Sequence, residues 1–449
     1  MVKVGTAYRC RVCDSQSPVP MGRCPRCGEW GTMEAKKEFA PKRVIGLRRG
    51  DRPLSEPVLK LEEVDPVGLR RIPSGVKEVD QVLGGGWVPG MVLLLAGEPG
   101  IGKSTLLLQL AHLAAEQGDR PLYIAGEESL SQIKLRAERI GVAPTLSVTR
   151  EVDARTLAEH LRLNPQNLVV VDSVQTLVAE DGATPGTFTQ VRDSTALLSQ
   201  AAKESDATLV LIGHITKQGS IAGPKVIEHM VDATLVLESA SGFRILRAMK
   251  NRFGPAGEVG VFEMREAGLT AVPNPSEAFL AERQSDVSGS VVVAALEGQR
   301  PLLLEVQALA AKSPYPSPRR VVQGLDQRRV DVVLAVLERR VDLPLTGLDV
   351  FVNVAGGLRL TDPGTDLAVA LAVYSAVTGR PLPKNTAVVG EVGLTGEIRS
   401  VAQLGRRVRE AKRSGYRRLI GPAALGVECL HAQSLAEALA ATWQGPEGD

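Results

Sequence analysis

Aromatic residues are scarce in this chain, whose 449 residues include 7 Phe, 5 Tyr and 3 Trp, or 3% of the total. The apolar cores must therefore consist mainly of Leu, Val, Ile and Ala. So few rings also disfavour stacking on aromatic side chains as the main way of holding nucleic acid bases. We expect any contact with nucleic acid to be chiefly electrostatic.

A long hydrophobic run and an excess of either charge are absent as well. No stretch approaches the roughly 18 apolar residues needed to span a bilayer, and residues 1–10 lack the apolar core of a signal peptide. We therefore expect a cytoplasmic protein without membrane contact. The 53 Lys and Arg residues and the 51 Asp and Glu residues leave a net charge of +2, so local clusters must decide whether a polyanion binds.

The length indicates two or three domains, because single cores stop growing well before 449 residues. With 44% apolar and 23% charged residues the chain is typical of globular proteins, which disfavours wholesale disorder, collagen and coiled coil. We divide it into a cysteine-rich segment (1–35), a basic linker (36–66), an α/β domain (67–275), a polar linker (276–289) and a second domain of strands and helices (290–449).

Short apolar runs alternate with helix-length segments in the first α/β domain, which predicts a largely parallel sheet covered on both faces. Predicted strands are 91–96, 121–125, 168–172 and 208–213, and the runs 234–239 and 243–250 are expected to form an antiparallel hairpin. Predicted helices begin at Lys103 and lie near 130–140 and 190–204, and in the second domain near 325–340, 365–378, 402–414 and 434–441.

The strongest motif is GEPGIGKST, which fits the phosphate-loop pattern GxxxxGK[ST] and lies between an apolar strand and a helix. Its glycines let backbone N–H groups turn toward the phosphates of ATP, Lys103 places an ammonium on them, and Ser104 is set to bind Mg²⁺. The residues expected to bind the nucleotide are Gly97, Glu98, Pro99, Gly100, Ile101, Gly102, Lys103, Ser104 and Thr105.

Carboxylates follow two of the predicted strands. The run LVVVD ends in Asp172, which we predict to bind Mg²⁺, although buried strands also often end in an Asp that caps a helix. The run PLYIAGEES contains Glu127 and Glu128, one of which is expected to orient and deprotonate the attacking water. A capping role for Glu128 at the following helix is an equal alternative.

A third strand ends in His214 and Thr216, and a glycine-spaced loop follows as far as Pro224. We expect His214 to lie beside the nucleotide, where the loop would couple the γ-phosphate to a bound polymer. A purely structural role for this histidine is equally compatible with the sequence.

Four of the five cysteines form two CxxC pairs, Cys10 with Cys13 and Cys24 with Cys27, separated by ten residues, while Cys429 stands alone. Two such turns complete the tetrahedral coordination of a structural Zn²⁺ ion. A redox-active CxxC is the disfavoured alternative, because the duplicated motif lies in so short a segment.

The order of the cysteine finger, GEPGIGKST, GEES, LVVVDSVQT, HITKQGSIAGPKVIEHMVD and KNRFG (residues 250–254) resembles the bacterial RadA/Sms recombination and repair ATPases over essentially the whole chain. The resemblance implies a RecA-like core that forms a hexameric ring, binds single-stranded and branched DNA and drives branch migration. It also implies a recombinase or replicative helicase as partner. Lys250 and Arg252 of KNRFG would act as arginine fingers on a neighbouring subunit's γ-phosphate, and a solvated strand end is the alternative.

The segment from residue 290 resembles the proteolytic domain of the Lon family, at residues 361–379 and 390–422. ATP-dependent proteolysis is therefore a rival function, but the positions of the serine-lysine dyad fall on Gly364 and Gly405, so we expect no active protease. A KaiC-like oligomeric ATPase scaffold that does not act on DNA is a second alternative.

The same domain contains a basic segment, residues 406–418, in which seven of thirteen residues are cationic. On a helix, Arg406, Arg409, Lys412 and Arg413 share one face. That face could bind the phosphates of DNA, or it could be a solubilising outer face, and the sequence gives the two equal weight.

Overall fold

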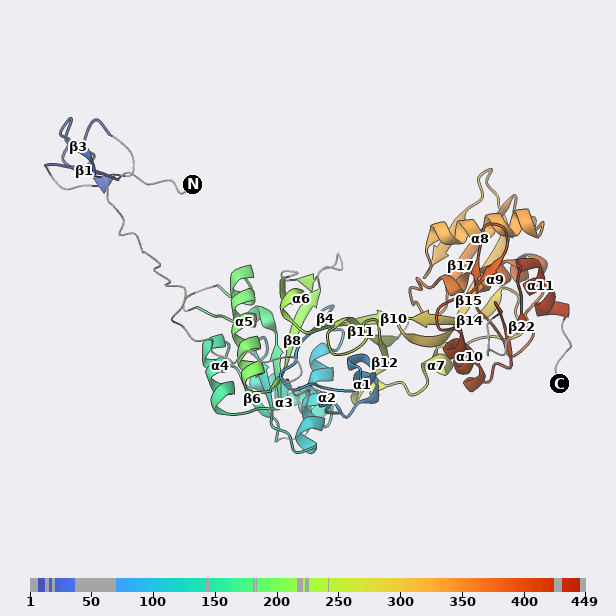
Figure 1. Cartoon of the computed structure of the whole chain (residues 1–449), viewed down its shortest axis with the longest axis horizontal. Coiled ribbons are helices and arrows are strands. Elements are labelled where there is room, and N and C mark those ends of the chain that lie inside the picture. The colour runs from blue at the N-terminus through green and yellow to red at the C-terminus, as the bar shows by residue number, and fades with distance from the viewer. Residues whose placement is uncertain are drawn as a thin grey trace, which may run out of the picture. The chain divides into compact units, whose positions relative to one another are not determined.

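The computed structural model of the chain describes residues 7–12, 16–17, 21–36, 70–142, 145–180, 182, 184–215, 221–222, 226–240, 242–423 and 430–444. The chain divides into two compact units, Met1–Asp65 and Pro66–Asp449, each described below by itself (Figure 1). Within the described ranges, every helix is too short or too polar to cross a membrane.

The first unit contains a small antiparallel sheet, in which β1 (Ala7–Cys10) lies between β2 (Gln16–Ser17) and β3 (Met33–Lys36). Hydrogen bonds between backbone groups close its loops, with Gly31 N donating to Gly22 O over 2.8 Å. Among the described residues of this unit, Cys10 and Cys24 are buried and Cys27 is exposed.

A ten-stranded sheet dominates the first part of the second unit, and its central strands are parallel. These strands are continuous apolar runs because both of their faces are covered. The parallel strands are β4 (Val92–Gly97), β5 (Pro121–Ala125), β6 (Ser147–Thr149), β7 (Leu168–Asp172), β8 (Thr208–Ile215) and β10 (Ala233–Ala240). An antiparallel edge follows with β11 (Phe243–Asn251), β12 (Val259–Arg265) and β13 (Gly268–Ala271), and β9 (Ile221–Ala222) pairs with β8.

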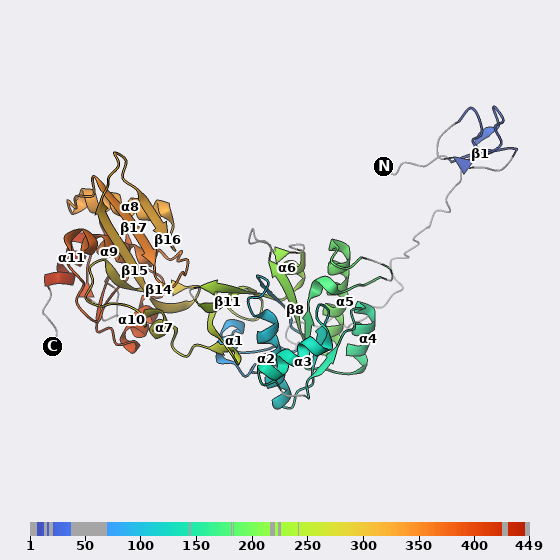
Figure 2. The same ribbon diagram turned by 180° about the vertical axis from the view of Figure 1, so that it is seen from behind.

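The pleat of these strands decides which helices cover which face. Alternate residues such as Leu93 and Leu95 of β4 pack in one core with α1 and α2, whereas Val92 and Leu94 pack in another with α4 and α5. Figure 2, which views the chain from behind, shows α2 and α3 next to one another beside this sheet. The helices are α1 (Lys77–Leu83), α2 (Lys103–Glu116), α3 (Leu130–Arg139), α4 (Ala154–Leu163), α5 (Phe188–Glu204) and α6 (Val226–Met230).

The second part of this unit has its own seven-stranded mixed sheet. Helices α8 and α9 pack on one face of its two longest strands and α10 on the other. Its strands are β14 (Ser290–Glu297), β15 (Arg300–Lys312), β16 (Arg320–Gln323), β17 (Leu348–Val354), β18 (Thr386–Val388), β21 (Arg418–Gly421) and β22 (Leu430–His431), with β19 (Glu391–Val392) and β20 (Ile398–Arg399) as a separate pair. Its helices are α8 (Gln327–Arg340), α9 (Asp366–Thr378), α10 (Leu404–Arg413) and α11 (Leu435–Gln444).

The strands and helices named from the sequence are confirmed, most of them to within two residues at each end. The predicted polar linker 276–289 overlaps a short helix, α7 (Pro275–Leu280), in which Ser276 and Phe279 are buried. The predicted domain limits stay predictions, since residues 66–449 form one compact unit.

The basic segment 406–418 contains one fully buried cation. Arg407 of α10 is 0% exposed and forms a bidentate ion pair with Asp362, while its Nη1 also donates to Ala294 O over 2.8 Å. The exposed face of α10 therefore contains Arg406, Arg409, Lys412 and Arg413, as the helical spacing predicts, and Arg407 serves the core instead.

Replacing Arg407 with Ala should destabilise this domain by about 3–5 kcal/mol, because Asp362 would remain buried without its cation. Urea unfolding measures the effect. The exposed neighbour is the matched control, and Arg406→Ala should change the unfolding free energy by less than about 0.5 kcal/mol. Equal effects of the two substitutions would contradict a structural role for the Arg407–Asp362 pair.

Candidate nucleotide and metal sites

The phosphate loop joins the end of β4 to the start of α2, and its backbone requires glycine. Gly100 and Gly102 have φ of 76° and 117°, a region that L side chains rarely adopt. A Cβ on Gly97 would lie 2.7 Å from Leu237 O of the neighbouring strand. The guanidinium of Arg244 donates to Ile101 O over 3.2 Å and holds the loop from the β11 side.

Lys103, the first residue of α2, is only 4% exposed, and its ammonium donates to Gly97 O and Glu98 O at 2.9 Å each. Burial lowers the pKa of Lys103, and the nearby carboxylates of Asp172 and Glu127 partly oppose that shift. The ammonium is thus held inside the loop at the amino end of α2. This cradle of glycines, backbone N–H groups and one cation fits the phosphates of a nucleotide.

Asp172 lies at the carboxyl end of β7, and its Oδ2 accepts a 2.6 Å hydrogen bond from the hydroxyl of Tyr123 on β5. Burial, followed by the charge and hydrogen bond of Asp172, raises the pKa of Tyr123, and the charge of Arg136 and the side chain of Ser104 oppose that shift. Ser104 and Asp172, the two predicted Mg²⁺ ligands, therefore both influence this phenol. A hydroxyl beside a carboxylate fits a hard divalent cation. Tyr123 gave no signal in the sequence because it lies inside an apolar run.

The paired glutamates have different surroundings. Glu127 is exposed, its backbone N–H donates to Asp172 O over 3.3 Å, and its carboxylate accepts a hydrogen bond from Ser173. Glu128 is ion-paired with Arg136 of α3. The cap of α3 is Ser129, which forms a capping box with Gln132, so the alternative that Glu128 caps this helix is wrong.

His214 lies in β8 directly opposite Gly97, so the backbone of this residue borders the phosphate loop. Its predicted contact with the nucleotide stays a prediction. Thr216 and most of the loop to Pro224 lie outside the described residues, apart from the two residues of β9.

The KNRFG motif begins with the last two residues of β11, Lys250 and Asn251, and continues into the following turn. The ammonium of Lys250 donates to Glu228 O at 2.7 Å and to Val231 O at 2.6 Å, and Arg252 forms a 3.2 Å ion pair with Asp232. Burial lowers the pKa of Lys250, and the positive charge of Arg252 adds to that shift. Lys250 is tied to backbone carbonyls, whereas Arg252 keeps an exposed side chain.

Strand register separates this motif from the phosphate loop of the same chain. Asn251 pairs with Ala233, and Ala233 pairs with Leu93 at the start of β4, whereas the phosphate loop begins at Gly97. Four residues of strand amount to roughly 13 Å. Lys250 and Arg252 therefore lie at the sheet edge opposite to the loop that contains Lys103.

The cysteines of the first unit form a cluster. The Sγ atoms of Cys10, Cys24 and Cys27 all lie within 4.8 Å of one another, with Cys10 and Cys27 separated by 3.6 Å. Sulfur atoms around a tetrahedral Zn²⁺ with bonds of about 2.3 Å lie roughly 3.8 Å apart, so the cluster fits this ion. Cys13, the fourth predicted ligand, lies outside the described residues.

The Arg407–Asp362 ion pair lies beside Gly364, the position at which the Lon family has its nucleophile. A Cβ on Gly364 would lie 2.9 Å from Arg407 Nη1. The hydroxyl of the adjacent Thr365 is buried and donates to Asp362 O over 2.8 Å. Gly405, at the predicted lysine position, is in the first turn of α10.

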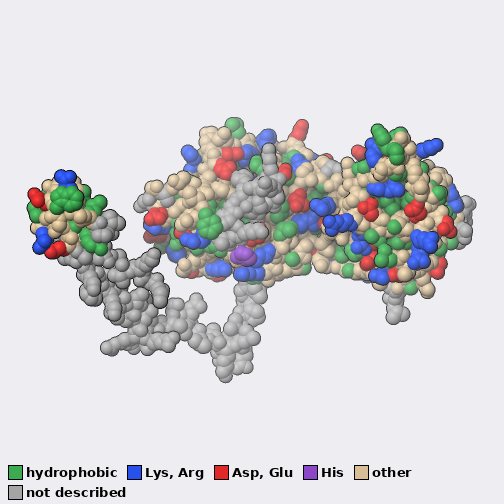
Figure 3. Space-filling view, turned by 90° about the horizontal axis from the view of Figure 1, so that it is seen from above, with side chains coloured by type: hydrophobic (Ala, Val, Ile, Leu, Met, Phe, Trp, Pro, Cys, Tyr) green, Lys and Arg blue, Asp and Glu red, His purple; other side chains and the backbone are tan. Residues whose placement is uncertain are grey.

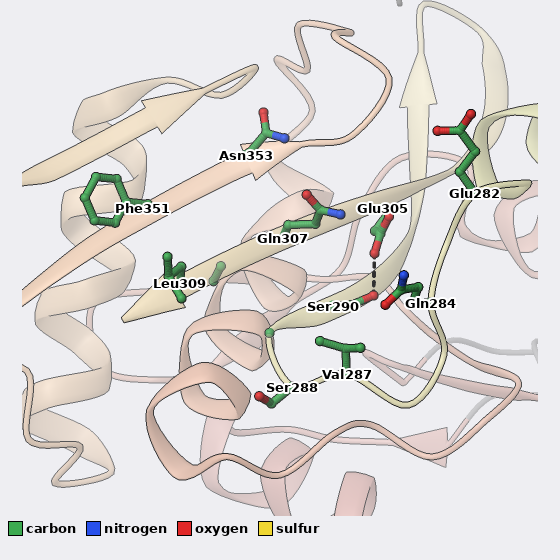
Figure 4. A pocket seen from close by; sticks show the side chains of 12 residues that line it. Glu282, Gln284, Val287, Ser288, Ser290, Glu305, Gln307, Leu309, Phe351 and Asn353 are labelled. Carbon is green, nitrogen blue, oxygen red and sulfur yellow. Dashed lines mark hydrogen bonds between the residues drawn. The ribbon is translucent and has the colours of Figure 1, made fainter. Parts of the chain in front are cut away.

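A cavity of about 450 Å³ in the same domain is lined by residues of β15 and β17 and of the segment that precedes β14. Figure 4 shows amide and carboxylate side chains around it, among them Gln307, Asn353 and Glu305. None of the residues predicted to bind nucleotide or metal lines it.

On the face seen in Figure 3, Lys and Arg side chains are interspersed with acidic ones, in keeping with the net charge of +2.

Three family models match separate parts of the chain. An AAA domain matches residues 60–220, a rubredoxin metal binding domain matches residues 8–35, and subunit ChlI of Mg-chelatase matches residues 323–424. Together with the phosphate loop and the sheet order, they define a RecA-like P-loop ATPase with an N-terminal zinc-ribbon segment and a Lon-protease-like α/β domain.

Relatives that match over nearly the whole length specify the family. The chain is 43% identical over 432 residues to the DNA repair protein RadA of Halalkalibacterium halodurans, covering 94% of this chain and 93% of the relative. It is 42% identical to that of Bacillus subtilis (98% and 99% covered) and 43% identical to that of Mycobacterium tuberculosis (98% and 93%). The chain belongs to the RadA family of DNA repair proteins. A solved KaiC-like protein of Pyrococcus horikoshii is 20% identical, with a TM-score of 0.40 over 46% of this chain and 100% of that one.

Glu127→Gln should lower the rate of ATP hydrolysis on the order of 10²-fold or more and leave nucleotide binding intact, because only the carboxylate that would activate water is neutralised. Steady-state hydrolysis and equilibrium binding of a labelled nucleotide measure the two properties. Glu128→Gln is the matched control and should lose much less activity. The opposite order would assign water activation to Glu128.

Cys24→Ser should release about one zinc ion per chain and loosen the first unit, because a structural site needs all four thiolates. A colorimetric zinc assay measures the metal content of the full chain. Thermal unfolding of the same protein measures the stability of residues 66–449. Cys429→Ser, a change at the cysteine outside the motif, should retain the metal. Stoichiometric zinc in Cys24→Ser would argue against a four-cysteine site.

Proposed function

We propose that this protein is a DNA-stimulated ATPase of recombinational repair, which binds single-stranded and branched DNA and drives branch migration as a hexameric ring in the cytoplasm. Its relatives are DNA repair proteins, which supports the biological setting. The observation that carries the motor assignment is the separation of Arg252 from its own phosphate loop, described above. A recombinase or replicative helicase would be its partner.

The residues of one subunit would perform the nucleotide chemistry in this way. Backbone N–H groups of the phosphate loop and the ammonium of Lys103 bind the β- and γ-phosphates of ATP. Ser104 and Asp172 hold Mg²⁺, which neutralises phosphate charge when bound. Glu127, held by Ser173 beside Asp172, orients the attacking water and accepts its proton.

The neighbouring subunit would complete the site. Arg252 is 56% exposed in its side chain, and its partner Asp232 also accepts from Val92 N over 3.1 Å, which leaves the guanidinium able to exchange its carboxylate for a phosphate. Lys250 supports the same turn through one carbonyl within α6 and one that directly follows it. In a ring, the sheet edge with KNRFG would face the phosphate loop of the next subunit.

DNA would be held mainly through its phosphates. A cavity of about 530 Å³ is bordered by Lys77 of α1 and by Arg406, Arg409 and Arg413 of α10. The two acids in its wall, Glu78 and Glu410, are paired with Arg300 and Arg413, so Lys77, Arg406 and Arg409 leave the cavity with an excess of positive charge. This favours phosphate binding over a merely solubilising face for the basic residues of α10. Aromatic stacking has little part, given the scarcity of rings.

We further propose that the Lon-like domain does not cleave peptides. Gly364 and Gly405 offer neither a nucleophile nor a base, and the hydroxyl of Thr365 is engaged with a backbone carbonyl. The buried Arg407–Asp362 pair fills the space beside Gly364. The domain would serve assembly and DNA contact instead.

The decisive experiment measures ATP hydrolysis with and without single-stranded DNA in a preparation whose oligomer mass is determined at the same time. We expect stimulation by DNA in ring-sized particles, and stimulation should fall as salt rises. Lys103→Ala should abolish hydrolysis and is the control for contaminating ATPases. Ring-sized particles that hydrolyse ATP at the same rate with and without DNA would favour the KaiC-like scaffold instead.

Mixing variants tests the shared site. Arg252→Ala chains should bind ATP and hydrolyse it poorly, because the γ-phosphate loses a cation from the neighbouring subunit. Lys103→Ala chains lack the other half of the site, so mixed rings should contain some interfaces with an intact loop and an intact Arg252. Hydrolysis should then exceed that of either variant alone. No gain in particles shown by mass to contain both chains would place Arg252 within its own subunit's site or on DNA.

A further inference from the structure

The turn between β14 and β15 of the Lon-like domain touches the ATPase core at a single backbone-to-backbone contact. Gln299 N donates to Gly257 O over 3.2 Å. A Cβ on Gly298, whose φ is 59°, would lie 1.3 Å from Gly257 O and so could not be accommodated. Position 298 therefore requires glycine because two chain segments from different domains meet there without any side chain between them.

Two ion pairs flank this contact. Arg300 donates to both carboxylate oxygens of Glu78 on α1, at 2.5 and 3.2 Å, and to Val259 O at 3.0 Å. Glu78 also accepts from Val261 N over 2.9 Å and is 6% exposed in its side chain. On the other flank, Glu297 is ion-paired with Arg247 of β11. Removing Arg300 would leave the buried carboxylate of Glu78, which also accepts a hydrogen bond from the backbone of β12, without its cation. This would destabilise the contact between the two domains.

The segment held by these contacts is the connection between β11 and β12, which contains the last three residues of the KNRFG motif. Its amino end is fastened to the core, where Asn251 Nδ2 donates to Leu83 O over 3.1 Å and Arg71 donates to Phe253 O. Its carboxyl end is closed by Gly257 N, which donates to Ala248 O over 2.7 Å. Arg252 lies within the first of these anchors, and its own backbone N–H donates to Asp232 O over 3.0 Å.

We propose that Gly298 and Arg300 are positioning residues for Arg252, so that the Lon-like domain fixes the connection that delivers this cation to the neighbouring subunit. The inference rests on the proposed role of Arg252 across the subunit boundary. Neither positioning residue touches the nucleotide. Both act by holding the backbone that carries the guanidinium, and a preorganised cation stabilises transition-state charge better than a loosely held one.

The test uses Arg300→Ala in the full chain. We expect nucleotide binding to stay within about twofold of the unaltered protein, while kcat falls on the order of 10²-fold, the scale of a misplaced catalytic group. Arg300→Lys keeps the charge but loses the two-pronged contact with Glu78, so it should recover part of the lost kcat. The matched control is Arg329→Ala, which removes an arginine paired with buried Asp366 inside the Lon-like domain and should keep kcat.

Mixed rings distinguish a positioning role from a general loss of stability, because only a positioning role predicts which mixtures regain ATP hydrolysis. Arg300→Ala chains fail to supply a positioned Arg252 but keep an intact phosphate loop. Mixed with Lys103→Ala chains they should therefore regain hydrolysis, and mixed with Arg252→Ala chains they should not, because both would be deficient in the same half of the site. Exchange of amide hydrogens in residues 248–258 should also be faster in Arg300→Ala than in Arg329→Ala.

The outcomes separate the two levels of the proposal. If Arg252→Ala is complemented by Lys103→Ala but Arg300→Ala is not, the positioning role is wrong and the shared site stands. If Arg252→Ala itself is not complemented, the shared site is wrong and the positioning role falls with it. Should circular dichroism show that Arg300→Ala does not fold, Arg300→Lys takes its place in the same mixtures, and unchanged kcat and unchanged exchange in that variant would overturn the proposal.

Discussion

The pairing of β4 between β8 and β10 is the constraint on which the other features depend. It places Gly97 beside His214 on one side and beside Leu237 on the other, so the phosphate loop emerges from the middle of a buried parallel sheet. The same register fixes the start of β4 against Ala233, and through it against the end of β11. One sheet thus displays a phosphate loop at one edge and a pair of cations at the other, which is the arrangement that a site shared between adjacent subunits needs.

Hydrogen bonding through Tyr123 organises the chemistry at the first edge. Its hydroxyl donates to Asp172 of β7 over 2.6 Å, which joins two groups that are 49 residues apart in sequence. The neutral phenol stays protonated there, because burial and the adjacent carboxylate both raise its pKa. Near the second edge the Lon-like domain contacts the ATPase core, through Arg300 on Glu78 and Val259 O and through the turn at Gly298 on Gly257.

Much of this organisation was predictable from the sequence, for identifiable reasons. The buried strands PLYIA and LVVVD are continuous apolar runs with turn residues after them, and their ends were predicted to the residue. By contrast β6, a three-residue strand with two exposed side chains, has no such run, and it went unpredicted. Tyr123 and Arg407 could not have been assigned, because their partners lie 49 and 45 residues away and only the tertiary fold brings them together. The need for glycine at 298 likewise arises from a contact between two domains.

The central claim is that Arg252 of one subunit faces the phosphate loop of the next. Cysteine cross-linking tests it most directly, with Arg252→Cys in one preparation and Glu98→Cys in another, treated after mixing with a short bifunctional thiol reagent in the presence of a non-hydrolysable ATP analogue. Mass spectrometry of the peptides identifies the joined positions and separates them from links made by the other cysteines. We expect a link between residue 252 of one chain and residue 98 of another. A variant with both cysteines in one chain is treated in the same way. A link between 252 and 98 within that single chain, together with no link between chains in the mixture, would contradict a shared site.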